Sequence, residues 1–146
     1  MSLKISGQRL LGRFGWTCAN ERLEKKLMLQ CDFDELKSCL ENNDAPDSIL
    51  LALCFPKPVR ELRSFARSIE QNMWECVVVM AFLQQYQGSG GDCAVKIATV
   101  CSINPNGTIQ VICGNETFIA INLFDLDLQI GEMVYLHRRV VIEKAE

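Results

Sequence analysis

The stretch that decides the fold is residues 104–123, NPNGTIQVICGNETFIAINL. β-Branched and aromatic residues alternate with polar ones along it, and a period of two is typical of β-strands. Two turn signals, Asn104-Pro105-Asn106-Gly107 and Cys113-Gly114-Asn115-Glu116, bound the alternating runs. Such turns join neighbouring strands as tight hairpins. The stretch therefore predicts strands over Thr108–Cys113 and 116–123.

The residues on both sides of this stretch continue the pattern. Residues 93–103 and 133–143 each read as a strand, and Gln129-Ile130-Gly131-Glu132 reads as a turn before the second of these. Four to five short strands are too few for a two-sheet sandwich, and closing into a barrel removes their exposed edges. We therefore expect a small OB-like antiparallel β-barrel over residues 93–146.

The part before the barrel has a different character. Gly88-Ser89-Gly90-Gly91 predicts a flexible linker over residues 88–92. From Val59 to Leu83 apolar residues recur every three or four positions, which predicts one long amphipathic helix that starts at Pro58. Shorter helices are expected over residues 20–30 with Asn20 as cap, after Asp32, and over 47–54. The predicted fold class is α+β, with a helical domain at 1–87.

Composition and charge narrow the function classes. The chain has 146 residues, 49% of them hydrophobic, and a net charge of −3. Its second part is acidic, whereas a nucleic-acid binder is expected to present a basic surface. The start of the chain lacks the pattern of a signal peptide, and its apolar runs are shorter than the ~20 residues of a membrane span. We expect a cytoplasmic protein without membrane contact.

The reactive residue types fit no common catalytic template. There are eight cysteines and one histidine, and no two cysteines have the close spacing of a zinc site. In a reducing compartment such thiols act mostly as small buried hydrophobes. A Gly-x-Ser-x-Gly motif and a phosphate-binding glycine loop before a helix are both missing. The sequence therefore predicts a protein that is not an enzyme.

A family resemblance adds a specific expectation. Residues 93–100 (CAVKIATV), 107–111 (GTIQV) and 130–137 (IGEMVYLH) resemble the HypC/HupF hydrogenase maturation chaperones. The resemblance covers residues 93–144 and implies an OB-like barrel that carries an iron fragment between maturation proteins. It implies that Cys93 and His137 bind the metal, with iron as the cofactor, and a thiolate is a suitable soft ligand for it. The alternatives are an ordinary strand-edge thiol and an exposed strand histidine.

Two groups of basic residues are candidate partner-binding sites. Arg60, Arg63 and Arg67 share one face of the predicted long helix, and Arg138-Arg139 form a second basic pair. A solvated face interleaved with acidic residues is the alternative for the first group.

Three functions remain open from the sequence. The first is a hydrogenase-maturation-like chaperone or metal-cofactor assembly protein that docks a protein partner. The second is a non-catalytic binding module that forms a homodimer through the long helix. The third is a single-stranded nucleic-acid binder, which the acidic charge of the barrel half disfavours.

Overall fold

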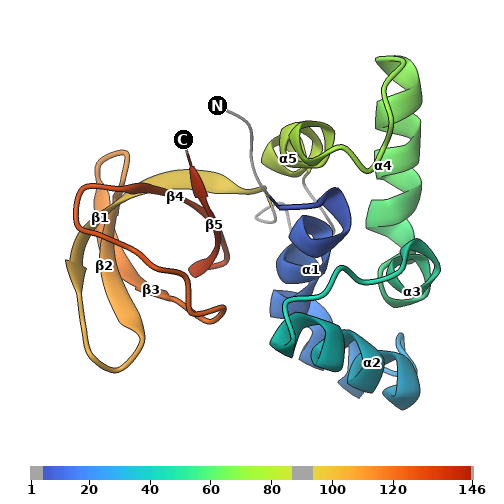
Figure 1. The fold of residues 1–146 in the computed structure, drawn as a ribbon, viewed down its shortest axis with the longest axis horizontal. Coiled ribbons are helices and arrows are strands. Elements are labelled where there is room, and N and C mark those ends of the chain that lie inside the picture. Colours follow the sequence, from blue (N-terminus) through green and yellow to red (C-terminus); the bar gives the residue numbers. More distant parts are fainter. Residues whose placement is uncertain (1–4, 87–93, 146) are drawn as a thin grey trace. The chain divides into compact units, whose positions relative to one another are not determined.

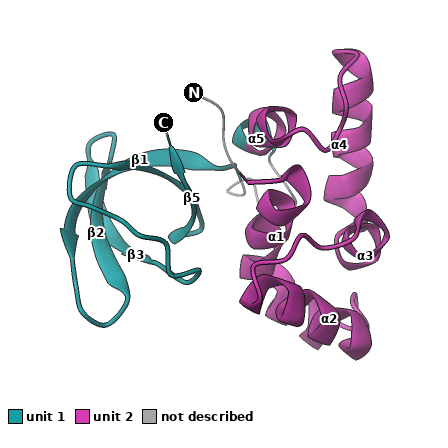
Figure 2. Ribbon diagram, in the orientation of Figure 1, with its two compact units in different colours: residues 1–2, 84–146 teal, residues 3–83 magenta. Residues whose placement is uncertain are grey.

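The computed structural model of the chain describes residues 5–86 and 94–145. Within these residues the fold is α+β, with five helices followed by five strands (Figure 1). The chain divides into two compact units, residues 3–83 and 84–146 (Figure 2). We call them the helical unit and the barrel unit. The predicted linker at 88–92 lies outside the described residues.

The helices of the first part are α1 (Gly7–Glu24), α2 (Gln30–Glu41), α3 (Ser48–Cys54), α4 (Pro56–Ser68) and α5 (Cys76–Gln85). The prediction for residues 47–54 is confirmed, and the Asp47 side chain caps α3 by accepting from the Ile49 amide at 2.7 Å. The prediction that Asn20 starts a helix is wrong. It lies inside α1, which is capped by Ser6 accepting from the amide of Arg9.

The single long helix predicted after Pro58 is also wrong, because the chain turns between α4 and α5. Glu70 has a positive φ of 55°, and the Gln71 amide donates to the Ala66 carbonyl at 3.0 Å. This is the αL termination that commonly closes a helix. The Asn72 side chain then accepts from the Trp74 amide at 2.9 Å. The apolar period continues across the turn because α4 and α5 both bury apolar residues. The period therefore indicates buried positions and does not distinguish one long helix from two.

The core of the helical unit is apolar, and the packing is close. The largest fully buried side chains of this unit are those of Leu10, Leu11, Leu36, Leu51, Leu62, Leu83 and Val79. Gly15 of α1 faces the ring of Phe55, and a Cβ at this glycine would overlap the ring. The sequence therefore needs glycine at this position for the chain entering α4 to approach α1.

The strands are β1 (Lys96–Ile103), β2 (Thr108–Cys113), β3 (Glu116–Ile121), β4 (Met133–His137) and β5 (Val140–Ala145). They form a closed sheet in the order β1-β2-β3-β5-β4, with β4 pairing back to β1. The described pairings are antiparallel except that of β3 with β5, where Ile121 lies beside Val140. The core inside the sheet consists of Ala98, Val100, Ile109, Val111, Ala120, Leu128, Val134, Leu136 and Val141.

Two of the expected hairpins are confirmed and one was missed. The turns at Gly107 and Gly114 stand where predicted, and both glycines have positive φ angles, 85° and 62°. The stretch 133–143, predicted as one strand, is instead the hairpin β4–β5. Its two-residue turn consists of Arg138 and Arg139, with φ angles of 51° and 68°. Two positive φ angles define a type I′ turn.

The prediction that most cysteines are buried holds for only one cysteine in the described part of the chain. The seven cysteines in the described part of the chain are all free, and of these only Cys54 is fully buried, whereas Cys31 is exposed. No helix in the described ranges is both long enough and apolar enough to cross a bilayer.

Candidate binding surfaces of the barrel

The two predicted metal ligands have different outcomes. Cys93 lies outside the described residues. His137 is the last residue of β4 and has no exposed surface, so its interpretation as an exposed strand residue is wrong. Across residues 5–86 and 94–145, no group of three or more His, Cys, Asp or Glu side chains is arranged to hold a metal ion.

The basic residues predicted to bind a partner fall in different units. Arg60, Arg63 and Arg67 are exposed on α4, and the opposite face of this helix is buried through Val59 and Leu62. Arg138 and Arg139 form the β4–β5 turn. The predicted basic residues therefore form two separate groups, one in the helical unit and one in the barrel unit.

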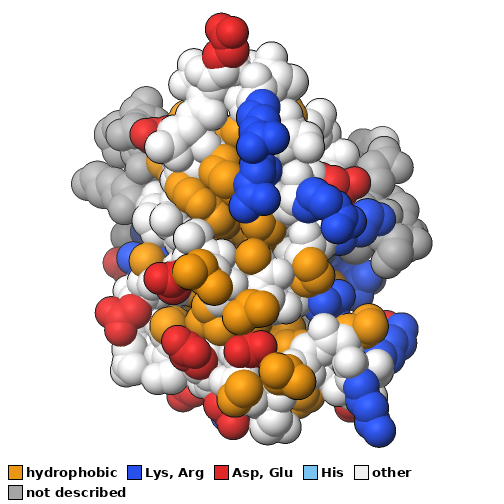
Figure 3. All heavy atoms as spheres, turned by 90° about the vertical axis from the view of Figure 1, so that its right-hand side faces the viewer, with side chains coloured by type: hydrophobic (Ala, Val, Ile, Leu, Met, Phe, Trp, Pro, Cys, Tyr) orange, Lys and Arg blue, Asp and Glu red, His pale blue; other side chains and the backbone are white. Residues whose placement is uncertain are grey.

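The helical unit also exposes apolar side chains. Ile49 and Leu53, one turn apart on α3, are 70% and 55% exposed, and Leu29 before α2 is 67% exposed. Figure 3 shows hydrophobic side chains gathered on one face, with Lys and Arg toward one side of them. The helical unit therefore exposes apolar surface on α3 and just before α2.

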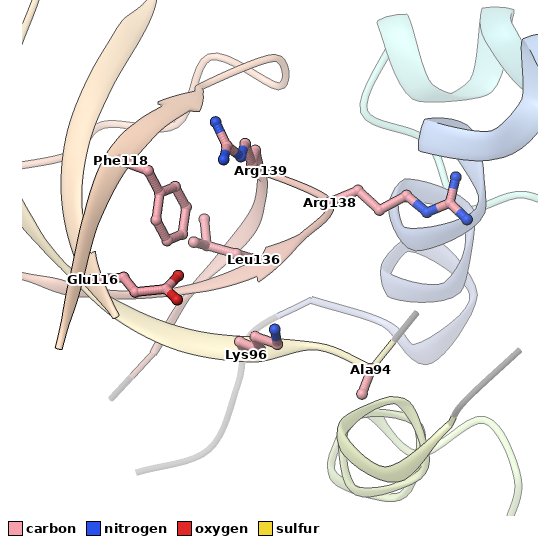
Figure 4. Close-up of a pocket in the computed structure, with 7 residues that line it drawn as sticks. All are labelled: Ala94, Lys96, Glu116, Phe118, Leu136, Arg138 and Arg139. Carbon is pink, nitrogen blue, oxygen red and sulfur yellow. The ribbon is translucent and has the colours of Figure 1, made fainter. Parts of the chain in front are cut away.

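One open end of the barrel contains a hollow of about 170 Å³ (Figure 4). Its walls are side chains near the strand ends, on the same face of each strand as the core residues. They are Lys96 of β1, Glu116 and Phe118 of β3, and Leu136 of β4. Ala94 and the two turn arginines complete the lining. The hollow is thus apolar at its base and charged at its rim.

Arg139 is held in place by an aromatic ring. Its guanidinium carbon lies 5.1 Å from the ring centroid of Phe118. A planar guanidinium over an aromatic face gains cation–π attraction and keeps its N–H edge available for an acceptor. In Figure 4 Arg139 lies over Phe118, whereas Arg138 extends away from it.

Positive charge in the barrel unit is concentrated at this hollow. Residues 94–145 contain four cationic side chains, and Lys96, Arg138 and Arg139 line the hollow. The fourth, Lys144, lies 3.6 Å from the carboxylate of Glu132. Of the five acidic residues in the same range, only Glu116 lines the hollow. An acidic unit therefore has one locally basic site.

The second surface is a band without charged residues on the outside of the sheet, which we call the uncharged band. The strand register aligns Thr99, Ile112 and Thr117 in one row across β1, β2 and β3. The hydroxyl of Ser102 donates to the Gln110 side chain at 3.4 Å in the next row. The full band is Ile97, Thr99, Ser102, Thr108, Gln110, Ile112, Thr117, Ile119 and Ile121.

The isoleucines of the band are well exposed. Ile112 is 44% exposed, and Ile119 and Ile121 are each 47% exposed. Sequence reasoning missed this surface, although a signal was present. In alternating strands one set of positions is expected to be polar, and here both sets are rich in β-branched apolar residues.

The chain matches no model of a known protein family and none of the curated proteins with which it was compared. The fold and the two surfaces define it as an α+β protein whose small closed sheet combines an uncharged outer band with a basic hollow.

Proposed function

We propose that this protein is a binding module that docks a protein partner on the uncharged band of its barrel. The observation that carries the proposal is the uncharged band, in which nine residues aligned across β1, β2 and β3 include no charged side chain. Charged residues are depleted from the centres of protein interfaces, and the exposed side chains of Ile112, Ile119 and Ile121 add apolar area to this surface. Binding, rather than catalysis, is the activity we assign to it.

The strand order supports an OB-like barrel as the finer description of the fold. The order β1-β2-β3-β5-β4 and the parallel contact of β3 with β5 are the arrangement found in OB barrels. Such barrels use the face of strands 2 and 3 for ligands. A single-strand binder carries aromatic stacking platforms and basic side chains there. The isoleucines and threonines on this face favour a protein partner instead.

A narrower form of the proposal is a hydrogenase-maturation-like chaperone that also carries iron. Its support is the resemblance over residues 93–144, and it assigns iron binding to Cys93 with His137 nearby. Equal iron content in the wild-type chain and in a Cys93→Ala variant would remove this form. The homodimer through one long helix is not proposed, because that helix is two helices.

Site-specific photo-crosslinking tests the docking proposal. A photoreactive phenylalanine analogue is placed at Ile112 or Ile119 of the full chain, in the cells that produce it. We expect the same discrete protein product at both positions. Adding Glu at the neighbouring Ile121 should reduce its yield about tenfold, because it buries an unpaired charge in the interface.

The matched control places the analogue at Lys57, an exposed position on α4, and this position should give no such product. A product composed of two copies of the chain would replace the partner with a homodimer. Absence of any product at the band positions, or equal yield with and without Ile121→Glu, contradicts the proposal.

A further inference from the structure

The hollow at the open end of the barrel has the charge of an anion site. Lys96 and Arg139 line it beside one acidic side chain, Glu116, whereas the Arg138 side chain extends away, and the stretch has more acidic than basic residues overall. Such gathering of one sign of charge against apolar walls raises the local concentration of the opposite charge. The wall residues Phe118 and Leu136 provide these apolar surfaces.

Arg139 is oriented for an acceptor before any ligand arrives. Its position over the Phe118 ring limits the rotamers of a long side chain that is otherwise exposed. A guanidinium held in this way loses less entropy when it forms paired hydrogen bonds with a carboxylate. The arrangement therefore favours a planar anion that accepts two parallel hydrogen bonds.

The turn holds these arginines in a conformation that their side chains disfavour. Both turn residues have positive φ angles, where type I′ turns prefer Asn and Gly. A non-glycine residue in this region costs roughly 1 kcal/mol. Backbone strain of this kind clusters at functional sites, which agrees with a role for the Arg139 side chain beyond closing the hairpin.

The size of the hollow and the charge around it select the ligand class. About 170 Å³ accommodates one side-chain-sized group rather than a row of phosphates. Glu116 at the rim and the net negative charge of the barrel unit oppose a polyanionic nucleic-acid strand. A single carboxylate beside apolar atoms meets the cations without the same repulsion.

From these observations we infer that the hollow binds a single carboxylate side chain of the protein partner, with Arg139 as the main ligand. The inference rests on the proposed docking function, because the carboxylate is taken to belong to the docked protein partner. It adds a second contact, which gives the partner a preferred orientation on the barrel.

Fluorescence anisotropy with the full chain and a dye-labelled, end-blocked peptide that carries one glutamate between leucines tests the inference. Binding is expected at low ionic strength and should weaken at about 0.3 M salt. Arg139→Gln should weaken it about tenfold, the usual effect of losing a charge-assisted hydrogen bond. Arg139→Lys should restore only part of the affinity, because it keeps the charge and loses the planar geometry.

Two further variants separate the hollow from general charge and from folding. Lys144→Gln removes one positive charge outside the hollow and should change the affinity less than about twofold. Arg139→Gly removes the ligand while suiting the positive φ. It should lose binding with an unfolding temperature within a few degrees of the wild type.

Several outcomes would overturn the inference. They are no binding of the glutamate peptide, an equal loss with Lys144→Gln, and tighter Arg139-dependent binding of a short oligothymidylate. The last would assign the hollow to nucleic acid. Crosslinking at Ile112 that persists beside any of these results leaves the docking proposal in place, so the two can fail separately.

Discussion

Cys54 is the fully buried thiol at the end of α3. Burial, together with the negative charges of Asp32 and Glu35, raises its pKa to about 11, although Arg22 opposes the shift. Its Sγ donates to the Asp32 carbonyl oxygen at 3.8 Å. The thiol is therefore neutral at physiological pH and a poor nucleophile.

Cys54 makes stability depend on alkaline pH. The folded pKa of about 11 exceeds the ordinary value of 9.0, so the unfolded chain loses its proton first as the pH rises. The contribution is fully present below pH 9 and is lost progressively toward pH 11, by roughly 2–3 kcal/mol. Urea unfolding at about pH 8 and about pH 10.5 should show a smaller loss for Cys54→Ala than for the wild type. Equal losses in the two proteins would contradict this assignment.

The residue scale also shows where sequence reasoning reached its limit. The caps predicted at Asn20 and Asp32 are wrong because both residues lie inside helices, and Asp47, predicted as the first residue of a helix, is the cap of α3. The exposed state predicted as the alternative for His137 was wrong, because its burial depends on strands distant in sequence. Arg139 was recognised as a candidate, but its contact with Phe118 joins the β4–β5 turn to β3, which is distant in sequence.

At the scale of elements, the boundary between α4 and α5 depends on a backbone conformation. Glu70 takes the αL position after α4, and the amides of Glu70 and Gln71 satisfy the carbonyls of Arg67 and Ala66. An amphipathic period cannot reveal this boundary, because both helices contribute to buried surface. The sequence also lacks the glycine that usually marks such an end.

Replacing Glu70 with glycine should stabilise the protein. Glycine adopts a positive φ without the steric conflict of a side chain, so the free energy of unfolding should rise by about 1 kcal/mol. Glu61→Gly, in the exposed interior of α4, is the control and should lower it by about 1 kcal/mol. Urea denaturation measures both. A loss of stability in Glu70→Gly would show that the positive φ of Glu70 does not cost the folded protein stability.

The strands allow a parallel comparison. The glycine-containing turns at Gly107 and Gly114 were predicted, because glycine reports a positive φ directly. The turn at Arg138-Arg139 was read as strand, because arginine carries no such signal and the apolar alternation continues through Val140.

At the scale of the whole molecule, the barrel unit has a core of its own. The buried residues of this cluster run from Ala98 to Val141, and none comes from the helices. The helical unit buries a separate set that includes Leu36 and Leu62. A division into two compact units follows from these two sets.

Core truncations should therefore act mainly within their own unit. Val111→Ala, at a position with no exposed surface, is expected to destabilise the barrel unit by about 2 kcal/mol. Hydrogen exchange should show faster exchange for amides of 96–145, with those of 7–85 little changed. Leu62→Ala should give the reverse pattern. Uniform acceleration over both ranges in either variant would show that the units unfold together.

The sequence by itself determined the α+β class, the change from a helical part before residue 88 to strands after residue 92, and the glycine turns, because local propensity and short-range periodicity encode these features. The tertiary structure alone decided the break between α4 and α5, the hairpin turn at Arg138-Arg139, the uncharged band and the hollow beside Arg139. The first two depend on backbone conformations at residues other than glycine, and the band and the hollow depend on which distant residues pair across the sheet. Such long-range pairing leaves no periodic trace in a single sequence.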